Sequence, residues 1–311
     1  MPAIPTPTSS STEGRPPGPM VSVCVVNWRT ADETLTMAAS LPAGAGDVPW
    51  ELIVADNASG DGSVERLSEA LPHATVFDTG GNLGFGTGVN RAAEKASGDW
   101  LFILNPDTVV HERAIQVLVE YLSQNPDVGA VGPKMVDAVG SRQASARSFP
   151  TAAAAMFRHT LLGRLFPSNR YAADYLMSDL PQDRPSEVDW LSGSAMMLPR
   201  RAFEAVDGFD EDFFMYCEDI DICRRLWDEG HRVVYHPGAT VEHTIGAASD
   251  KAQAAMIREH HRSMLKYYRK HLVHDVPWLL RPTYPVGISL RHALRQLHRW
   301  SLEQRHRRRR R

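Results

Sequence analysis

Three carboxylates crowd into four positions of the segment FFMYCEDIDICRR, residues 213–225. Glu218, Asp219 and Asp221 follow a run of large apolar side chains and precede two arginines. Like charges so close together raise one another's pKa unless a cation or a hydrogen-bond donor intervenes, so the segment is typical of a proton-transfer site or of the surroundings of a metal ion. Acids in the first turn of a helix also stabilise the helix dipole, which explains the same residues structurally. The segment alone leaves both interpretations open.

A second group of polar residues follows an apolar run at residues 51–55. In ELIVADNASGDGS, the residues Asp56, Asn57 and Ser59 come directly after a predicted strand. Open α/β sheets bind ligands beyond the carboxyl ends of their parallel strands. We therefore expect these three side chains to face a ligand.

The segment DWLFILNPD repeats this pattern after a predicted strand at residues 100–104. Pro106 ends the strand, and Asn105 and Asp107 lie two positions apart, so that their oxygens can face one ligand. An aspartate beside a diphosphate is a suitable ligand for Mg²⁺ or Mn²⁺. An Asx turn that caps the next helix is the competing structural explanation. His243 occurs much later, and a lone histidine is more often structural than a ligand.

The glycine-rich segment GGNLGFGTG contains Asn82 and Gly84 and precedes a helix predicted at residues 89–96. Its backbone amides can approach a phosphate or ribose at the start of that helix. The glycines lack the GxGxxG order and follow the third strand instead of the first, so a plain flexible loop is the simpler account.

The elements that must position these residues alternate between strand and helix. Strands are predicted at residues 21–28, 51–55, 74–79, 100–104 and 128–137, and helices at 32–41, 63–71, 89–96 and 112–123. This alternation predicts a mainly parallel sheet with right-handed crossovers. A long, partly helical excursion over a cleft is expected at 138–188, then strand, small-residue turn and strand at 188–200, a short helix at 201–212 and a strand at 231–237.

Composition indicates a soluble globular protein of one large or two ordinary domains. The three cysteines, without a CxxC pair, favour a reducing compartment and argue against a disulfide framework. Residues 1–19, rich in Pro, Ser and Thr, are expected to be a disordered leader and no signal peptide. No apolar run reaches the length of a membrane span, and the cytoplasm is the expected compartment.

Charge is divided unevenly along the chain. The net charge is −3, yet residues 251–311 hold 16 lysines and arginines against 3 acids. Basic helices are predicted at 258–270 and 288–300, the second with an apolar face, followed by RHRRRRR. This pattern suits an anionic membrane surface, with nucleic acid as the competing partner and a solvated, disordered end as the structural alternative.

Taken in order, the blocks VVNW, ADNASGDGS, NLGFGTGVN, LNPD, WLSGSAMMLPR, GFDEDFFMYCEDIDICRR and HTIG resemble glycosyltransferase family 2, in particular its bacterial rhamnosyltransferase-like members. The resemblance covers residues 20–270. It implies the GT-A fold, an α/β architecture with a Rossmann-like, mainly parallel central sheet flanked by helices. The glycosyltransferase domain would span 20–250, with a nucleotide-binding half at 20–135 and an acceptor half at 136–250, before a basic helical extension at 251–311.

By the same resemblance, Asp219 is the expected catalytic base, with Glu218 and Asp221 as supporting acids. Asp107 and His243 are the expected ligands of a divalent metal ion, Mg²⁺ or Mn²⁺. The first Asp of the family's DxD motif is Asn105 here, which makes Asp107 the surer ligand. The residues expected to bind the nucleotide-sugar are Asp56, Asn57, Ser59, Asn82, Gly84, Asn105, Asp107, Trp190, Ser192, Gly193 and Arg225.

The resemblance implies an inverting transfer by a single displacement, from a nucleotide-diphosphate sugar to a glycan or polyprenyl-linked acceptor in cell-wall or polysaccharide assembly. The implied donor is dTDP-L-rhamnose. Such an enzyme would work at the inner face of the cell membrane, as a peripheral protein without a nucleic-acid partner, and its oligomeric state stays open. The competing hypotheses are a catalytically silent nucleotide-sugar- or membrane-binding protein on the same fold, and a nucleotidyltransferase.

Overall fold

The computed structural model describes residues 20–151, 175, 177, 179–244, 249–282 and 284–288. The predicted disordered leader, about half of the predicted excursion over the cleft and nearly all of the second predicted basic helix lie outside these residues.

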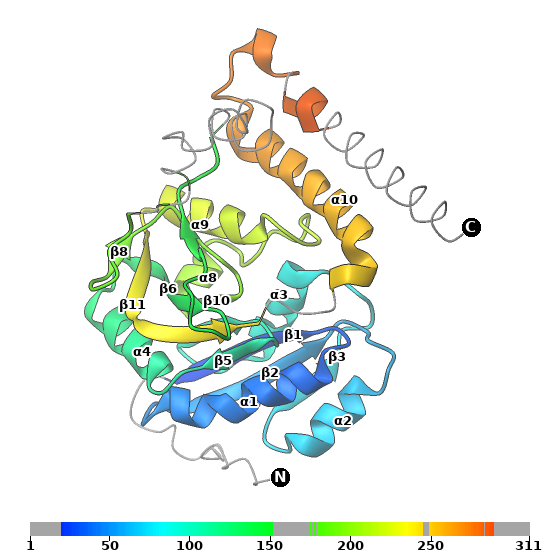
Figure 1. The fold of residues 1–311 in the computed structure, drawn as a ribbon, viewed down its shortest axis with the longest axis vertical. Coiled ribbons are helices and arrows are strands. Elements are labelled where there is room, and N and C mark those ends of the chain that lie inside the picture. Colours follow the sequence, from blue (N-terminus) through cyan, green and yellow to red (C-terminus); the bar gives the residue numbers. More distant parts are fainter. Residues whose placement is uncertain are drawn as a thin grey trace.

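The core of the molecule is one mixed sheet in the order β3-β2-β1-β4-β10-β6-β11-β5, with β8 beside β11 (Figure 1). The first four strands of this order run parallel, β10 runs antiparallel to both of its neighbours, and β11 is parallel to β6. The strands are β1 (Val21–Asn27), β2 (Trp50–Asp56), β3 (Thr75–Asp78), β4 (Trp100–Leu104), β5 (Thr108–Val110), β6 (Val128–Val136), β8 (Ser186–Glu187), β10 (Ala195–Pro199) and β11 (Arg232–His243). A separate small ribbon pairs β7 (Ala146–Arg147) with β9 (Trp190–Leu191).

Helices cover both faces of the sheet (Figure 1). Along β1, Val21, Val23 and Val25 pack toward α1, α2 and α4, whereas Cys24 and Val26 pack toward α3, α8 and α9. Strands that are buried on both faces have continuous apolar sequences, and for this reason they could be predicted from the sequence pattern. The helices are α1 (Ala31–Ala45), α2 (Ser63–Ala70), α3 (Phe85–Lys95), α4 (Ala114–Gln124), α8 (Arg200–Ala205), α9 (Glu218–Asp228) and α10 (Ser249–Tyr267).

The predicted α/β class and the mainly parallel sheet are confirmed. The predicted end of the first helix at Leu41 is wrong, because α1 continues through Pro42 to Ala45. Leu41 and Ala45 are both fully buried. Core packing of this last turn therefore outweighs the hydrogen bond that proline cannot make. The third helix likewise begins at Phe85, four residues before its predicted start.

The last body strand also differs from the prediction. Instead of ending at residue 237, the predicted strand continues to His243: β11 is one strand of 12 residues with a shift of register between His236 and Thr240. Its end pairs antiparallel with β5, which the sequence pattern did not indicate, and this pairing sets His243 opposite Thr108. The backbone N–H of Thr244 donates to the carbonyl of Asp107 at 3.0 Å. The pairing thus brings His243 beside the turn that carries Asp107.

The C-terminal helix α10 lies on the α9 side of the sheet (Figure 1). Ser263 donates to the carbonyl of Met215 at 2.7 Å, and Lys266 donates to the carbonyl of Asp212. A π-helical turn, Tyr268–Leu272, and a 3₁₀ turn, Trp278–Leu280, follow α10. No helix within the described part of the chain is long and apolar enough to cross a membrane. The predicted domain boundaries stay predictions.

Candidate active site

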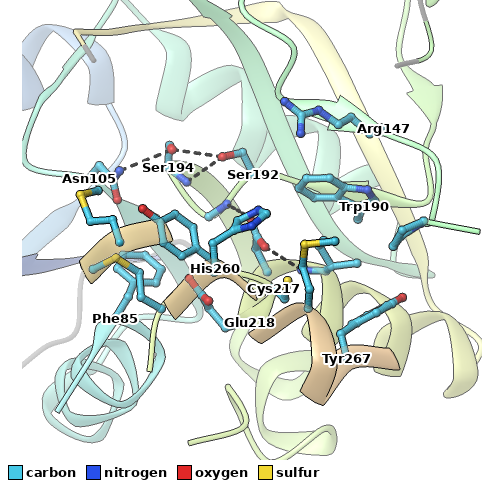
Figure 2. Close-up of a pocket in the computed structure, with 18 of the residues that line it drawn as sticks. Phe85, Asn105, Arg147, Trp190, Ser192, Ser194, Cys217, Glu218, His260 and Tyr267 are labelled. Carbon is cyan, nitrogen blue, oxygen red and sulfur yellow. Dashed lines mark hydrogen bonds between the residues drawn. The ribbon is translucent and has the colours of Figure 1, made fainter. Parts of the chain in front are cut away.

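A cavity of about 690 Å³ opens at the carboxyl end of β4, between the start of α9 and helix α10 (Figure 2). The residues that follow β1 and β4 line one side, and the turn between β9 and β10 lines the middle. Residues of α10 close the opposite side. The cavity therefore lies where an open α/β sheet is expected to bind its ligand.

Two carboxylates reach this cavity from the first turn of α9. Tyr216 and Cys217, directly before the helix, have left-handed φ angles of 70° and 67°. Such conformations cost about 1–3 kcal/mol each for non-glycine residues and are common at functional sites. They turn the chain so that Glu218 and Asp219 both line the cavity. The carboxylate of Asp219 accepts hydrogen bonds from the backbone N–H of Gly193 at 3.2 Å and of Ile220 at 2.9 Å.

The two carboxyls differ in how readily they ionise. Burial raises the pKa of Glu218 well above its ordinary value, and the negative charge of Asp219 raises it further. The Oε2 atom of Glu218 is buried without a hydrogen-bond partner. Burial also raises the pKa of Asp219, but the N–H groups of Gly193 and Ile220 and the charge of Arg147 oppose the effect. The surroundings therefore favour ionisation of Asp219 over ionisation of Glu218.

Asp107 and His243 meet at one end of the cavity. The Nε2 atom of His243 lies 3.3 Å from Oδ1 of Asp107. Gln143 holds the histidine from behind: its Oε1 lies 3.0 Å from Nδ1 of His243, and its Nε2 donates to the His243 carbonyl at 2.7 Å. With Nδ1 donating to Gln143, the lone pair of Nε2 faces Asp107.

This pair fits a divalent metal ion that substrate phosphates help to coordinate. No group of three or more His, Cys, Asp or Glu side chains within the described ranges forms a complete metal site. One carboxylate and one imidazole are nevertheless suitable protein ligands for Mg²⁺ or Mn²⁺. These ions usually complete their coordination shell with phosphate oxygens and water. The sequence pattern missed Gln143, because its contact with His243 spans 100 residues.

The predicted turn at residues 192–194 lies between the acids and the strand end of β4. The backbone N–H of Asn105 donates to the Ser194 carbonyl at 2.9 Å, and the Oγ atoms of Ser192 and Ser194 lie 3.1 Å apart. Asn105, Ser192, Gly193 and Ser194 all line the cavity. The structure thus places these predicted site residues together with Asp107 and Asp219.

Trp190 also lines the cavity, but its indole N–H is already used, because it donates to the Ser148 carbonyl at 2.9 Å. Its ring supports Arg147, whose guanidinium lies 5.2 Å from the ring centre. Arg147 is a cavity residue that the sequence pattern did not single out. It belongs to the stretch after β6, where no regular periodicity or motif marks it.

Asp56, Asn57 and Ser59 lie outside the cavity lining. Both oxygens of Asp56 accept hydrogen bonds within the chain: Oδ1 from the Ser59 N–H at 2.7 Å, and Oδ2 from Asn27 at 2.5 Å and the Ser59 hydroxyl at 2.7 Å. Asn57 donates to the carbonyl of Gly84 at 2.8 Å. These bonds hold the loop after β2 in place, and a role in nucleotide binding stays a prediction.

Asn82 and Gly84 belong to the turn before α3. Asn82 is exposed and accepts a hydrogen bond from the N–H of Gly84 at 3.3 Å. Gly84 has a φ of +90°, and a Cβ atom there would lie 2.1 Å from the carbonyl oxygen of Phe214. Gly84 is thus required by the approach of the loop that precedes the acids.

Asp221 and Arg225 do not line the cavity either. Asp221 is fully buried, and its Oδ2 accepts from Nε of Arg225 at 2.8 Å. Its Oδ1 lies 2.7 Å from Nζ of Lys270 and 2.6 Å from Nε2 of His271. Asp221 therefore contacts the chain after α10, and Arg225 is linked to that chain through Asp221. Any part that these two predicted site residues play in the reaction would be indirect.

Comparison with known proteins shows that the chain is similar to one family of enzymes. A family model described as glycosyltransferase like family 2 matches residues 16–265. An N-acetylglucosaminyl-diphospho-decaprenol L-rhamnosyltransferase of Mycobacterium tuberculosis is 37% identical over 227 residues, which are 69% of this chain and 73% of that protein. Rhamnosyltransferase WbbL of Escherichia coli is 28% identical over 258 residues, 80% of this chain and 92% of that protein.

Among solved structures, GalNAc-T7 with UDP, GalNAc and Mn²⁺ superposes with a TM-score of 0.57 at 15% identity. The match covers 79% of this chain and 47% of GalNAc-T7, so this chain spans about half the length of that protein. At this identity the likeness supports the fold alone.

Proposed function

The chain belongs to glycosyltransferase family 2, with the GT-A fold, and from this premise we propose that it is an inverting rhamnosyltransferase that uses dTDP-L-rhamnose. The observation that carries the proposal is the pair of carboxylates at the start of α9, which face one cavity with Asp107 and His243. The names of two relatives, both rhamnosyltransferases, support the donor sugar. A polyprenyl-diphosphate-linked sugar is the proposed acceptor, because the mycobacterial relative is named for such a substrate.

Asp219 is suited to act as the base. Its ionised carboxylate, held by the Gly193 N–H, would take the proton of the acceptor hydroxyl as that oxygen attacks the anomeric carbon of the donor. The bond between the anomeric carbon and the diphosphate oxygen breaks in the same step, and the nucleoside diphosphate leaves with the electron pair. The raised pKa of Glu218 favours Asp219 as the charged member of the pair.

Asp107 and His243 would hold a divalent metal ion, which would neutralise charge on the departing diphosphate. The turn at residues 192–194 joins the two ends of the cavity, because its Ser194 carbonyl accepts from the Asn105 N–H and its Gly193 N–H donates to Asp219. We therefore place the donor diphosphate at the Asp107 end of the cavity and the acceptor hydroxyl near Asp219.

Residues of α10 suit the lipid part of the acceptor. Met256, Met264 and Tyr267 line the cavity from this helix, together with Tyr284 beyond it. Apolar and aromatic side chains of this kind commonly line pockets for apolar ligands. The chain continues into residues 289–311, which hold nine arginines and one acid. We propose that the protein is peripheral at the anionic inner face of the membrane, where such an acceptor is embedded.

The function is tested by incubating the full-length protein and Mg²⁺ or Mn²⁺ with a panel of nucleotide sugars and GlcNAc-diphospho-polyprenol. We expect transfer from dTDP-L-rhamnose, with inversion at the anomeric carbon seen by NMR. Transfer from another donor alone would overturn the donor proposal, and a product with retained configuration would overturn the mechanism. Binding of dTDP-L-rhamnose without turnover would favour the silent nucleotide-sugar-binding alternative.

The metal proposal has a separate test. Asp107→Ala should abolish the part of dTDP binding that a chelator removes from the wild type, because the carboxylate ligand is lost. Glu112→Ala, which changes an exposed acid near the same turn, is the matched control and should bind as the wild type does. If Asp107→Ala retains chelator-sensitive binding, the turn after β4 is structural.

A further inference from the structure

Arg147 is a cation in the cavity wall whose charge lowers the pKa of Asp219 but to which the reaction above assigns no substrate contact. It lies on β7 and pairs in register with Trp190 of β9. The backbone around it is fixed, because the Ser148 carbonyl accepts the indole N–H of Trp190 and the N–H of Phe149 donates to Asp189 at 2.6 Å. The pairing of β7 with β9 and these two hydrogen bonds thus hold the backbone of Arg147 beside the cavity.

The guanidinium of Arg147 is supported by aromatic rings and not by a carboxylate. It lies 5.2 Å from the ring centre of Trp190 and 6.0 Å from that of Tyr175. Its Nε is buried without a hydrogen-bond partner, and although its charge lowers the pKa of Asp219, no carboxylate among the described residues lies close enough to form an ion pair with it. Stacking on rings leaves the planar fork of an arginine open to bind a phosphate through two hydrogen bonds. Arg147 therefore has the properties of an anion-binding residue.

The position of Arg147 separates it from the donor end. Asn105 and Arg147 lie on opposite sides of the Ser192–Ser194 turn in Figure 2. Within the described ranges, Arg147 is the one lysine or arginine that lines the cavity. An acceptor that carries its own diphosphate brings a second anion into the cavity, which Asp107 and His243 cannot serve while they face the donor. The cavity thus offers one cationic group on the acceptor side.

We propose that Arg147 binds the diphosphate of the acceptor, and this rests on the proposed transfer to a sugar-diphospho-polyprenol. The arginine holds the diphosphate beside Trp190, and the sugar hydroxyl extends from there to Asp219. The ring stack orients the guanidinium before the acceptor arrives, so that little side-chain freedom is lost on binding.

The probe for this site is farnesyl diphosphate, which carries the diphosphate and an isoprenoid but no sugar. Its Kd is measured by calorimetry with the full-length protein, with dTDP and Mg²⁺ saturating the donor end. Arg147→Gln should raise this Kd about 10- to 100-fold, as expected for losing charge-assisted hydrogen bonds. Arg147→Lys should recover part of the loss, since it restores the charge without the fork. The Kd of dTDP, measured alone, should change less than twofold.

Arg142→Gln is the matched control, because Arg142 lies in the same segment, is exposed and packs over Tyr235 at 5.6 Å outside the cavity. It should leave both Kd values unchanged, and thermal melting of each variant checks folding. Equal farnesyl diphosphate affinity in wild type and Arg147→Gln, or no binding to either, overturns the inference. A loss confined to dTDP would assign Arg147 to the donor diphosphate and also overturn it.

The outcome is separable from that of the proposed function. If no nucleotide sugar is turned over, yet Arg147→Gln still weakens farnesyl diphosphate binding, the transferase proposal fails while the anion site stands. If rhamnosyl transfer occurs and the KM for GlcNAc-diphospho-polyprenol is unchanged in Arg147→Gln, the transferase stands and this inference fails.

Discussion

Glu218 and Asp219 are neighbours in sequence, but their surroundings act differently on their pKa values: the charge of Asp219 raises that of Glu218 further, whereas the N–H groups of Gly193 and Ile220 oppose the rise at Asp219. Glu218 is 6% exposed and has an oxygen without a partner, so that its neutral form is favoured. Asp219 is turned toward backbone N–H groups that favour its ionised form. A pair of carboxyls with separated pKa values is a common arrangement in sites that move protons.

The pH dependence of turnover follows from the raised pKa of Asp219. A base must be ionised, so kcat/KM should be full above this pKa and fall as the pH decreases through it. The acid limb should therefore lie above the ordinary value for aspartate, about 3.9. Charged and titratable groups that interact with Asp219 include Glu218, Arg147, Cys217 and Cys223. The measurement is kcat/KM against pH for wild type and Glu218→Gln.

Glu218→Gln should leave the acid limb within about half a unit, because glutamine resembles the neutral carboxyl that Glu218 already presents when Asp219 ionises. A limb at the ordinary aspartate value would contradict the assignment of Asp219 as the base. A shift of more than about one unit in Glu218→Gln would show that Glu218 is charged in the active protein.

Among single residues, the sequence predicts the acids of the site better than it predicts the residues that contact them. Asp107 and Asp219 stand at recognisable positions after a strand and before a helix. Gln143 and Arg147 lie in a stretch without periodicity, and their contacts depend on strand pairings far along the chain. His243 was placed beside Asp107 by resemblance, because only the pairing of β5 with β11 makes them neighbours.

Among the elements, the turn before α3 and the loop before α9 depend on each other. The N–H of Phe85 donates to the carbonyl of Phe214 at 2.9 Å, and Gly84 lies against that same carbonyl. The segment 213–217 leads directly into the two acids. The glycine-rich turn therefore supports the position of the base, in addition to any contact with the nucleotide.

Gly84→Ala should lower the free energy of unfolding by about 3 kcal/mol or more, since it combines a left-handed φ with a backbone clash. Gly60→Ala is the matched control: Gly60 has a φ of +64°, but nothing lies within 4 Å of its added Cβ. This control should lose only about 1–2 kcal/mol. Urea denaturation of both variants makes the measurement, and equal losses would show that the approach of Phe214 is unimportant.

The elements themselves were predictable where burial on both faces produces continuous apolar runs, as in β1, β2 and β4. Three differences have physical causes that local patterns do not contain. Packing carries α1 through Pro42, a register shift joins two runs into β11, and β5 exists through its pairing with that strand.

On the scale of the whole molecule, Asp221 fastens the C-terminal extension to the body. Burial raises its pKa, but His271, Arg225 and Lys270 outweigh this and lower it. A lowered pKa in the folded state means that the stabilisation is present above the unfolded value, about 3.9, and is lost as the pH falls through the folded value. The anchor therefore holds at neutral pH, and it positions α10 over the cavity.

The extension carries an exposed apolar group beyond this anchor. Trp278, Leu279 and Val286 are 73%, 68% and 63% exposed, and they lie close in sequence to Tyr284 of the cavity wall. In a membrane-bound state these side chains would leave water beside basic residues that attract anionic lipid. Only a few residues of chain thus separate the exposed group from the cavity wall where the lipid of the acceptor is expected.

The double variant Trp278→Ser, Leu279→Ser should bind vesicles with 30% phosphatidylglycerol at least about tenfold more weakly than the wild type, because each buried apolar side chain contributes about 1.5–3 kcal/mol. Flotation of the full-length protein makes the measurement. Val139→Ser, at an 84% exposed position on another loop, is the control. Equal flotation of all three proteins would count against this surface, and no binding to anionic vesicles would count against a membrane role.

The fold of the whole molecule was predictable because ordered motif blocks over most of the chain resemble one family. The residues that the proposed acceptor would contact were not, because those on α10 and β7 pack around the cavity from distant parts of the chain. The charge division also predicted a separate role for the end of the chain. It did not show that residues 249–272 first return to contact the body around Asp221.

The central claim is that Asp219 is the base of a rhamnosyl transfer, and Asp219→Asn tests it most directly. The measurement is the dissociation constant of dTDP-L-rhamnose and the rate of transfer to GlcNAc-diphospho-polyprenol, for this variant beside Glu218→Gln. We predict donor binding within about threefold of wild type and a loss of turnover of about 10²- to 10⁴-fold for Asp219→Asn only. Transfer by Asp219→Asn at a near-normal rate would contradict the account.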